Sequence, residues 1–490
     1  MCITSEIGMT APITNNTLYR FRTINGLLGE YEELEKQSIF FAPPKLLNDP
    51  MEGSRLIHFK GDEVLWNNFF KHYLLTLLHH AMGVVLIGEK EDLSESIQIG
   101  FHTSTPPDHV RNLFPNTSTQ IAEHSLCKEI VNFLSNHRDE ISEVELIPYL
   151  TLLHHLALFI VFETMKKNSL IDKHPYEDYE SKLADPAEMF QNQIDLLKAH
   201  GDGWISEMSE QTRNAFEEME LIQLIEGDNS KNWQLLSSGF PRRYLKEIHK
   251  LMYGNWYTAC FMTDSSNSSV WGNYAEKHTG VCLIYDVNPP KSSNRYSLTL
   301  GNVTVGHSWS KHSGSVKRKG NRLFEFHDID YDSKPTSINF FEYLGRLPQV
   351  IADSSWFTFE GERSKHAITF DNEKREKYWA IRTDSLTTKS KDWEYENEKR
   401  LILDELLGGL PENGSTFTYD FKSLKGMIFG INTPTNKKLE IYNIIERKVK
   451  ENRHVRFKFY QAYYCEKSDT IEHKELSILN KKLIAACEYS

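Results

Sequence analysis

The chain has 490 residues, more than one hydrophobic core usually supports, so we expect two or three domains. Hydrophobic residues make up 39 % of it and aromatic residues 12 %, which excludes a mainly disordered chain. The formal net charge of -12 argues against non-specific nucleic-acid binding by the whole chain and leaves room only for a local basic patch.

The cysteines and the N-terminus predict a cytoplasmic protein. The six cysteines are scattered and none forms a Cys-x-x-Cys pair, so we expect reduced thiols. Residues 1–16 lack the basic and apolar runs of a signal peptide, and we predict a flexible tail. Two apolar runs lie at 73–88 and 146–162, and the second reaches the lower end of membrane-spanning length. Each contains a His-His pair, and we interpret both as buried core helices, with no metal and no membrane span.

The N-terminal segment predicts part of a sheet, followed by helices. Residues 18–22 (LYRFR) and 38–42 (SIFFA) are short strand-type runs, with a helix over 25–36 and a proline-rich loop over 43–53. From residue 57 the spacing becomes helical, so that 57–250 is predicted to be an all-α insert. Its predicted helices span residues 64–88, 118–135, 142–167, 186–199, 206–226 and 241–252.

Strand-type patterns return after residue 250. Residues 289–322 are polar, and 466–490 are predicted to be a charged tail. Strands and helices do not alternate regularly, so we predict an α+β fold: a mixed or antiparallel sheet core, residues 17–56 and 251–465, interrupted by the helical insert. The predicted strands span 258–261, 281–285, 378–382, 394–404, 417–420, 424–429 and 455–462, and the helices 271–278, 339–352 and 436–452.

The most distinctive motif is WEYENEKR at residues 393–400. On a strand the side-chain period is two, so Glu394, Glu396, Glu398 and Arg400 would share one face. Carboxylates gathered in this way need solvent, cations or a binding site to be stable. An exposed edge strand with salt bridges, or a helix, would also suit this composition.

Two further motifs carry aromatic and cationic side chains. In residues 260–280, Trp271, Tyr274 and His278 are spaced to lie near one helical face, where they could stack on a planar ligand or simply cover a sheet. Arg20 lies in the middle of a predicted strand and needs an anionic partner, either a ligand phosphate or an acidic residue of the loop around Asp49.

The order of these motifs resembles the bacterial domain-of-unknown-function family 2971. The likeness covers roughly residues 17–56 and 255–465, and a late GMIFG element at 426–430 also matches. The sequence departs from the family at Met262, where the family usually has Ser, and in the length of the insert. The matching residues are Tyr19, Arg20, Arg22, Asn48, Asp49, Pro50, Glu52, Cys260, Phe261, Trp271, Tyr274, Ala275, His278, Gly280, Lys389, Trp393, Glu396, Glu398 and Arg400.

A looser likeness to Arg-Ser-Glu ADP-ribosyltransferases suggests a chemistry with NAD as cofactor. By that resemblance Arg20 would hold the pyrophosphate, Thr263 the nicotinamide ribose, and Trp271 or Tyr274 would stack on nicotinamide. Glu398 would stabilise the developing cation and Glu396 would orient the acceptor. The resemblance adds three further residues to the NAD site: Tyr19, Asn48 and His278.

Three hypotheses about function follow. The first is an NAD-dependent ADP-ribosyltransferase or NAD-cleaving enzyme, acting as a bacterial toxin or phage-defence (antiviral) effector. The second is a non-enzymatic sensing or interaction protein, and the third a metal-dependent nuclease using Asp49, Glu396 and Glu398. A protein or nucleic-acid partner would bind the helical insert or the basic stretch at 291–322, which contains no acidic residue. The oligomeric state stays open.

Overall fold

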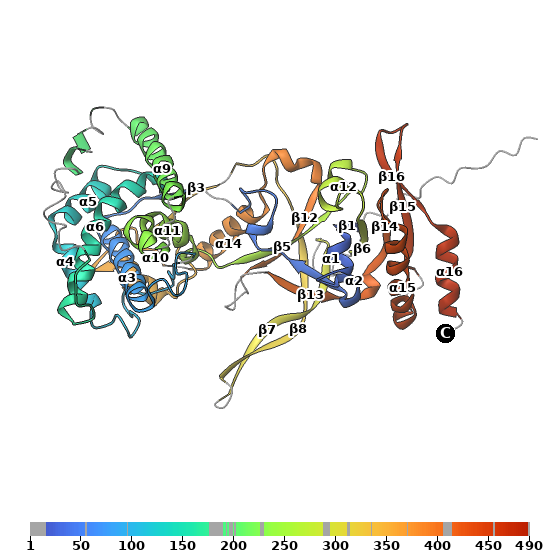
Figure 1. Cartoon of the computed structure of the whole chain (residues 1–490), viewed down its shortest axis with the longest axis horizontal. Helices are drawn as coiled ribbons and strands as arrows, with labels where there is room; N and C mark the ends of the chain where they lie inside the picture. Colours follow the sequence, from blue (N-terminus) through green and yellow to red (C-terminus); the bar gives the residue numbers. More distant parts are fainter. Residues whose placement is uncertain are drawn as a thin grey trace, which may run out of the picture. The chain divides into compact units, whose positions relative to one another are not determined.

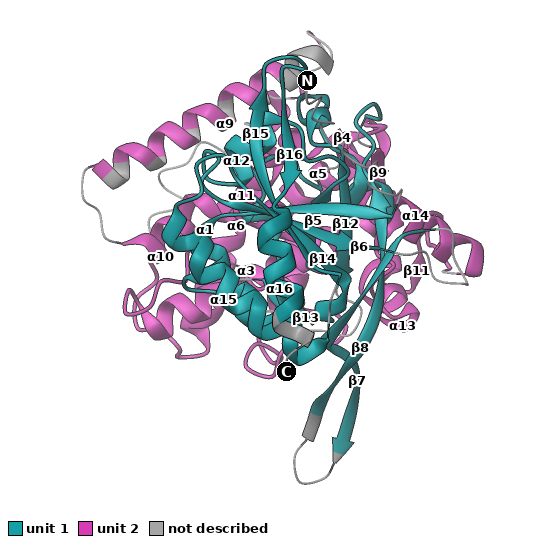
Figure 2. Cartoon of the chain, turned by 90° about the vertical axis from the view of Figure 1, so that its right-hand side faces the viewer, with its two compact units in different colours: residues 1–54, 255–335, 383–490 teal, residues 55–254, 336–382 magenta. Residues whose placement is uncertain are grey.

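The structure, a computed structural model, falls into two compact units (Figures 1 and 2). Unit 1 comprises Met1–Ser54, Asn255–Pro335 and Thr383–Ser490, and unit 2 comprises Arg55–Gly254 and Thr336–Arg382. The predicted tail at 1–16, except Asn16, and most of the predicted helix at 186–199 lie outside the described residues. The described residues are 16–53, 56–95, 97–175, 190–192, 194–195, 199, 202–225, 230–287, 295–310, 314–334, 336–369, 371–404, 414–453 and 456–488.

Unit 1 is built on a curled sheet of 11 strands in the order β16-β15-β14-β6-β1-β5-β12-β8-β7-β13-β2. Only β14 and β15 pair in parallel, and the other neighbours are antiparallel, so the predicted α+β class with a mixed sheet is confirmed. The strands are β1 (Thr17–Arg22), β2 (Ser38–Phe41), β5 (Trp256–Met262), β6 (Val281–Asp286), β7 (Ser297–Ser310), β8 (Gly314–Asp328), β12 (Glu398–Asp404), β13 (Ser415–Tyr419), β14 (Leu424–Phe429), β15 (Lys458–Cys465) and β16 (Thr470–Glu475).

The sheet curls so far that β2, the strand at one end of the order, reaches β5 in the middle of the sheet. Ala42, just after β2, exchanges two backbone hydrogen bonds with Thr258 of β5, at 2.8 and 2.9 Å. The strands from β5 to β2 therefore close around an apolar core. Because side chains alternate along a strand, one face supplies this core and the other faces away. Leu401, Leu403 and Phe261 belong to the enclosed core, whereas Met262 and Tyr19 belong to a smaller cluster on the other face.

Helices cover both faces of this sheet. Helix α15 (Thr435–Asn452) buries Ile441, Ile445 and Val449, which recur every four residues along one helical stripe, and with α16 (Ser477–Glu488) it packs on the enclosed-core face. Helix α12 (Ser268–Tyr274), capped by the side chain of Asn267, packs on the other face. Unit 1 also has the short helices α1 (Ile24–Leu28), α2 (Glu33–Lys36), η1 (Pro44–Leu46), η6 (Lys391–Glu396) and η7 (Phe421–Ser423).

Several sequence predictions for unit 1 are wrong in detail. The predicted charged tail at 466–490 contains β16 and α16, because Ile471 and Leu483 supply buried apolar contacts among the charges. The polar stretch at 289–322 contains most of the long β7–β8 hairpin. The predicted strand at 378–382 lies in helix α14 (Asn372–Thr387), where Tyr378 packs into the core of unit 2.

Unit 2 is mainly helical, with small sheets β4-β3-β9 and β10-β11. Residues 336–382 belong to unit 2, because Phe340, Phe341 and Trp356 pack against α3. The sequence pattern had assigned these residues to the sheet core, and that prediction is wrong. Its elements are β3 (Leu56–Phe59), α3 (Glu63–Ile87), α4 (Phe114–Glu123), α5 (Ser125–Asn136), β4 (Ile141–Ser142), α6 (Glu143–Lys167), α9 (Asp202–Ile225), α10 (Lys231–Gln234), η2 (Leu235–Gly239), α11 (Phe240–Ile248), η3 (His249–Leu251), β9 (Ser337–Asn339), η4 (Phe340–Tyr343), α13 (Gln349–Ala352), η5 (Asp353–Phe357), β10 (Thr358–Phe359), β11 (Glu362–Arg363) and most of α14.

Helices α3 and α6 contain the two apolar runs and their His-His pairs. By length and composition both could cross a membrane, and 61 % and 72 % of their most apolar windows are buried within the protein. The side chains of Asp62 and Ser142 cap their first turns. In α6, His154 accepts or donates at both ring nitrogens, 2.7 Å from the Tyr73 hydroxyl and 2.8 Å from the Leu236 carbonyl, so it is a hydrogen-bonded core histidine.

Candidate functional site

The WEYENEKR segment folds as a helical turn followed by a strand, so the predicted continuous strand over 394–404 is wrong. The 3-10 helix η6 ends at Glu396, Asn397 has a φ of 45°, and β12 begins at Glu398. Asn adopts this left-handed backbone conformation more readily than most residues do. The turn directs Glu396 and Glu398 to a common partner and leaves Glu394 exposed to solvent.

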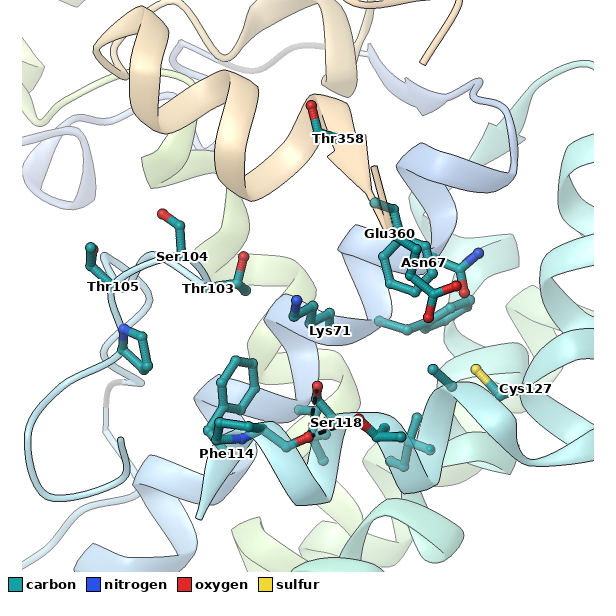
Figure 3. A pocket seen from close by; sticks show the side chains of 18 of the residues that line it. Asn67, Lys71, Thr103, Ser104, Thr105, Phe114, Ser118, Cys127, Thr358 and Glu360 are labelled. Carbon is teal, nitrogen blue, oxygen red and sulfur yellow. Dashed lines mark hydrogen bonds between the residues drawn. The ribbon is translucent and has the colours of Figure 1, made fainter. Parts of the chain in front are cut away.

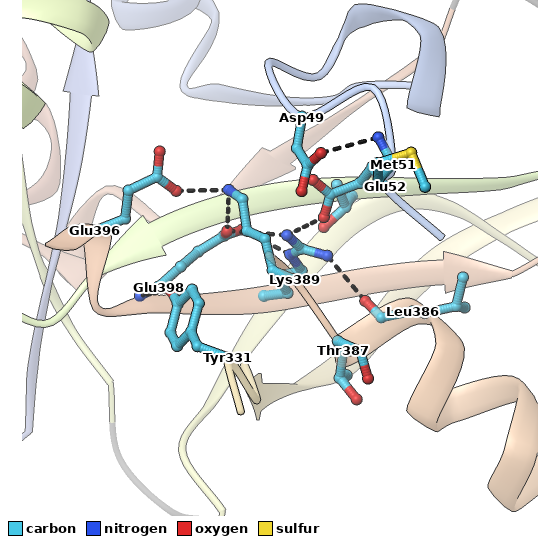
Figure 4. A network of polar contacts seen from close by, with 12 residues as sticks. Asp49, Met51, Glu52, Tyr331, Leu386, Thr387, Lys389, Glu396 and Glu398 are labelled. Carbon is cyan, nitrogen blue, oxygen red and sulfur yellow. Dashed lines mark hydrogen bonds and ion pairs between the residues drawn. The ribbon is translucent and has the colours of Figure 1, made fainter. Parts of the chain in front are cut away.

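That common partner is the ammonium group of Lys389 (Figure 4). Its Nζ donates to Glu396 Oε2 at 2.6 Å and to Glu398 Oε2 at 3.0 Å. The side chains of both glutamates are 0 % exposed, and that of Lys389 is 4 % exposed. A buried charge is stable only when it is paired in this way, so the three groups depend on one another.

Arg400 extends the network along β12. It donates from Nε to Glu398 Oε1 at 2.7 Å and from Nη2 to Glu398 Oε2 at 2.9 Å, a bidentate pair, and from Nη1 to the Leu386 carbonyl at 2.9 Å. It also forms an ion pair with Glu52, from the loop after β2. The polar network thus joins the loop after β2 to residues 386–400, two chain segments that are far apart in the sequence.

Two tyrosines complete the network. The Tyr274 hydroxyl, on α12, donates to Glu396 Oε1 at 2.5 Å, and the Tyr331 hydroxyl accepts from the backbone N–H of Glu398 at 2.9 Å. Burial beside Glu396 raises the pKa of Tyr274, and burial raises the pKa of Tyr331 to about 12. Both hydroxyls therefore stay protonated at neutral pH and act as hydrogen-bonding groups.

The carboxyl groups of the network differ in their proton affinity. Burial raises the pKa of Glu52 to about 7 in spite of nearby Arg400 and Lys389, and burial also raises the pKa of Glu396. Burial acts in the same direction on Glu398, but Arg400 and Lys389 outweigh it and hold its pKa at about 2. Glu398 is therefore the fixed anion of the network, with both cations bound to it.

Three neighbouring strands of the sheet carry Tyr19, Arg20 and Glu398 or, in the case of Thr263, end just before it. They are β1, β5 and β12, in that order. Tyr19 and Glu398 both pair with Met262 across β5, so these three side chains form a row on one face. Arg20 is the next residue along β1 and points to the other face, where its guanidinium lies 5.2 Å from the centre of the Phe261 ring.

Arg20 has a structural task on that other face. Its guanidinium donates to the Phe40 carbonyl of β2 at 3.0 Å and to the Cys260 carbonyl of β5 at 3.2 Å, and the side chain is buried. Arg20 therefore stabilises the seam, the place where β2 meets β5 and the curled sheet closes. Neighbouring carboxylates pair with other arginines: Glu33 pairs with Arg22, and Glu52 pairs with Arg400.

The remaining suggested NAD ligands are dispersed. Trp271 is fully buried, donates from its indole nitrogen to the Ser265 carbonyl at 2.8 Å, and stacks on His278 with 6.4 Å between ring centres. The Thr263 hydroxyl donates to the Asn397 carbonyl at 3.2 Å, and Asn48 lies exposed in the loop before Asp49. These residues do not line one NAD site together with Arg20, so we derive no reaction step through NAD.

The residues suggested as metal ligands are also engaged elsewhere. Glu396 and Glu398 bind Lys389, and Asp49 accepts a hydrogen bond from the backbone N–H of Met51 at 2.8 Å. Over the described ranges, no three His, Cys, Asp or Glu side chains are grouped as a metal ion would require. Lys389 lies seven residues before Glu396, and in the sequence only the family resemblance pointed to it. No sequence pattern pointed to Tyr331.

Comparisons with protein-family models, with curated proteins and with solved structures found no match. The resemblance to the domain-of-unknown-function family 2971 therefore stays a prediction.

Proposed function

We propose that this chain is a non-enzymatic interaction protein that binds single-stranded nucleic acid through the β7–β8 hairpin. The observation that carries the proposal is the composition of this exposed ribbon, which combines cations with an aromatic ring. Trp309 is 72 % exposed, and Lys317, Arg318, Lys319 and Arg322 are all exposed or half-buried on β8. In Figure 2 the outer parts of both strands extend beyond the remaining strands of unit 1.

The strand register places Trp309, Lys317 and Lys319 on one side of the ribbon, whereas Arg318 and Arg322 alternate to the other side. His307 pairs with Lys317 across the hairpin, and Trp309 and Lys319 each lie two residues from one of them, so all four share a face. Residues two apart on a strand are about 6.8 Å apart, so Lys317 and Lys319 can contact separate phosphates. Cations at this spacing suit phosphates, and an exposed indole suits base stacking, which tolerates any base sequence.

In this proposal the buried polar network around Lys389 and Glu398 stabilises the fold and takes no part in binding. The carboxylates of Glu396 and Glu398 are enclosed and bound to Lys389 and Arg400, so no face of them is open to a substrate. In contrast, the hairpin carries exposed cations and an exposed indole, although Lys319 Nζ donates to the Asn302 carbonyl at 3.2 Å. The strongly acidic chain as a whole would repel nucleic acid, which confines binding to this local basic surface.

The test is fluorescence anisotropy with labelled polyuridine and polythymidine oligonucleotides. Wild-type protein should bind, and the Lys317→Glu/Lys319→Glu double variant should lose roughly tenfold or more in affinity at low salt. The slope of log affinity against log salt should also become shallower by about 0.7 for each phosphate that the variant no longer neutralises. Trp309→Ala should weaken binding by about 1–3 kcal/mol.

Matched controls lie on the β15–β16 hairpin of the same unit. Lys467→Glu makes at an exposed turn the charge change of each single lysine replacement, and Tyr464→Ala removes a ring that is 53 % exposed. Both should leave affinity unchanged. Absence of binding by wild-type protein, equal binding by all variants, or binding to anionic lipid vesicles in place of the oligonucleotides would overturn the proposal.

A second candidate is an ADP-ribosyltransferase or NAD-cleaving enzyme, favoured by the adjacency of β1, β5 and β12. It needs a residue other than Arg20 for the pyrophosphate and an opening of the network around Glu398. Consumption of NAD by wild-type protein, abolished in Glu398→Gln while the fold is retained, would support it. No NAD consumption by folded wild-type protein would remove it.

A further inference from the structure

A cavity of about 660 Å³ lies entirely within unit 2 (Figure 3). Its walls come from α3, from α4, from the loop at 103–106 and from the turn after β10. This volume is in the range of small-molecule sites, and the lining is a mixture of polar and apolar side chains. The cavity shares no residue with the β7–β8 hairpin or with the polar network, both of which belong to unit 1.

The central feature of the cavity is the ammonium group of Lys71, on α3. In Figure 3 its side chain lies in the middle of the hollow, between Thr103 and Ser118. Over the described residues Lys71 has neither a hydrogen bond nor an ion pair, and its neighbours are the Phe359 ring, 5.9 Å away, and the charge of Glu360. Burial lowers the pKa of Lys71, since a half-buried cation lacks full hydration. An anion bound there would compensate that loss.

The remaining charges favour a single negative charge on the ligand. Arg111, at the rim, is already paired with Asp108, and Glu360 is the one carboxylate among the lining residues. A neighbouring hollow of about 590 Å³ shares Asn67, Thr119, Ala122, Phe359 and Glu360. It is lined by three more glutamates, Glu63, Glu123 and Glu362, against one cation, Lys128. A group with two negative charges, such as a phosphate monoester, would meet this acidic side, whereas a carboxylate needs Lys71 alone.

The apolar walls define the rest of the ligand. Phe70, Leu74, Phe114 and Ile121 are all buried, and with Phe359 they line the cavity. Ser118 and Thr119 also line the cavity, and their hydroxyls donate to the Pro115 carbonyl at 3.4 and 3.1 Å. We propose that this cavity binds a small carboxylic acid with an apolar or aromatic body, its carboxylate on Lys71 and its body against the phenylalanine and leucine side chains.

The test uses the full chain with anilinonaphthalene sulfonate as the probe, since it is an apolar monoanion with environment-sensitive fluorescence. The probe should bind saturably and be displaced by phenylpropionate, but not by the neutral phenylpropanol. Lys71→Met keeps most of the side-chain volume and should weaken phenylpropionate about tenfold to a hundredfold, the loss expected for one hydrogen bond to a charged group. Ser118→Phe, which fills the hollow, should abolish displaceable binding.

Lys246→Met is the matched control, because Lys246 is exposed on α11 and lies outside the cavity lining; it should leave the affinity unchanged. Near-ultraviolet circular dichroism checks that each variant keeps its tertiary packing, since the probe also binds loosened proteins. Probe binding that phenylpropionate does not displace, equal displacement by the acid and the alcohol, or unchanged affinity in folded Lys71→Met would each overturn the proposal. None of these outcomes bears on nucleic-acid binding by the hairpin.

Discussion

Replacement of Glu398 by Gln tests the polar network most directly. The substitution keeps the shape of the side chain and removes the one charge that Arg400 and Lys389 share. Its amide nitrogen must then face a cation that formerly donated to a carboxylate oxygen. Removing one partner of a buried ion pair costs about 3–5 kcal/mol. We expect the lower part of that range, since Lys389 retains Glu396 and Arg400 retains Glu52.

The loss should be visible in urea denaturation of the full chain, followed by circular dichroism and tryptophan fluorescence. With a denaturant dependence of about 1–3 kcal/mol/M, a loss of about 3 kcal/mol moves the midpoint of the unit 1 transition by about 1–3 M. Glu440→Gln is the control, because Glu440 pairs with Lys437 on an exposed turn of α15, and such pairs contribute at most about 1 kcal/mol.

The double variant Lys389→Met/Glu398→Gln sharpens the test. Both single changes remove the same ion pair, so their effects should add to more than the effect of the double variant. If the urea midpoint of Glu398→Gln equals that of Glu440→Gln, the claim that the polar network stabilises unit 1 is refuted. Additivity of the two single changes would refute the direct coupling of Lys389 with Glu398.

Three further changes follow from the same geometry. The pKa of Glu52 is raised from 4.5 to about 7, so the folded state binds the Glu52 proton more tightly than the unfolded state does. The stabilisation from this proton is fully present below pH 4.5 and is lost as the pH rises through 7. Glu52→Gln should flatten that decline in the urea midpoints measured across this pH range. Arg20→Met removes a buried guanidinium that donates to two carbonyls at the seam and should destabilise unit 1 by about 2–6 kcal/mol in the same assay. Gly53 has a φ of +68°, and a Cβ there would lie 2.7 Å from Trp256, so Gly53→Ala should cost about 2–4 kcal/mol by thermal or urea unfolding.

Each of these has an outcome that contradicts it. A wild-type midpoint that rises steadily from acid to neutral pH, with no effect of Glu52→Gln, contradicts the assignment to that carboxyl. Arg20→Met with wild-type stability would mean that the Phe40 and Cys260 carbonyls find other donors. Unchanged stability of Gly53→Ala would mean that the turn adapts at no cost.

Local patterns in the sequence predicted the individual elements well. Residues 258–261, 281–285 and 424–429 form strands β5, β6 and β14 with small shifts at their ends, because alternating apolar side chains specify a strand wherever one face is buried. The helices at 64–88 and 142–167 are α3 and α6, each with a capping side chain at its start. The predictions failed where polar residues form a ribbon, as in β7–β8, because exposed strands lack an apolar face to reveal them.

The candidate site shows where such prediction ends. The sequence marked Glu396, Glu398, Arg400, Tyr274 and Glu52 as unusual, and all five meet in one network. It assigned Arg20 to the same site, and the strand period places that side chain on the other face of the sheet. The difference is one residue along β1, which local composition does not reveal.

By itself, the sequence determined those strands and helices that have a clear apolar face, and which charged residues require partners, since both follow from local periodicity and from the cost of burying charge. Only the tertiary structure decided which partners these residues have and which way they face. Strand order, the closure of the curled sheet and the fold of unit 2 depend on contacts between residues distant in the chain. Those contacts pair Lys389 with two glutamates, commit Arg20 to the seam, and leave Lys71 facing a cavity, with no ion pair among the described residues.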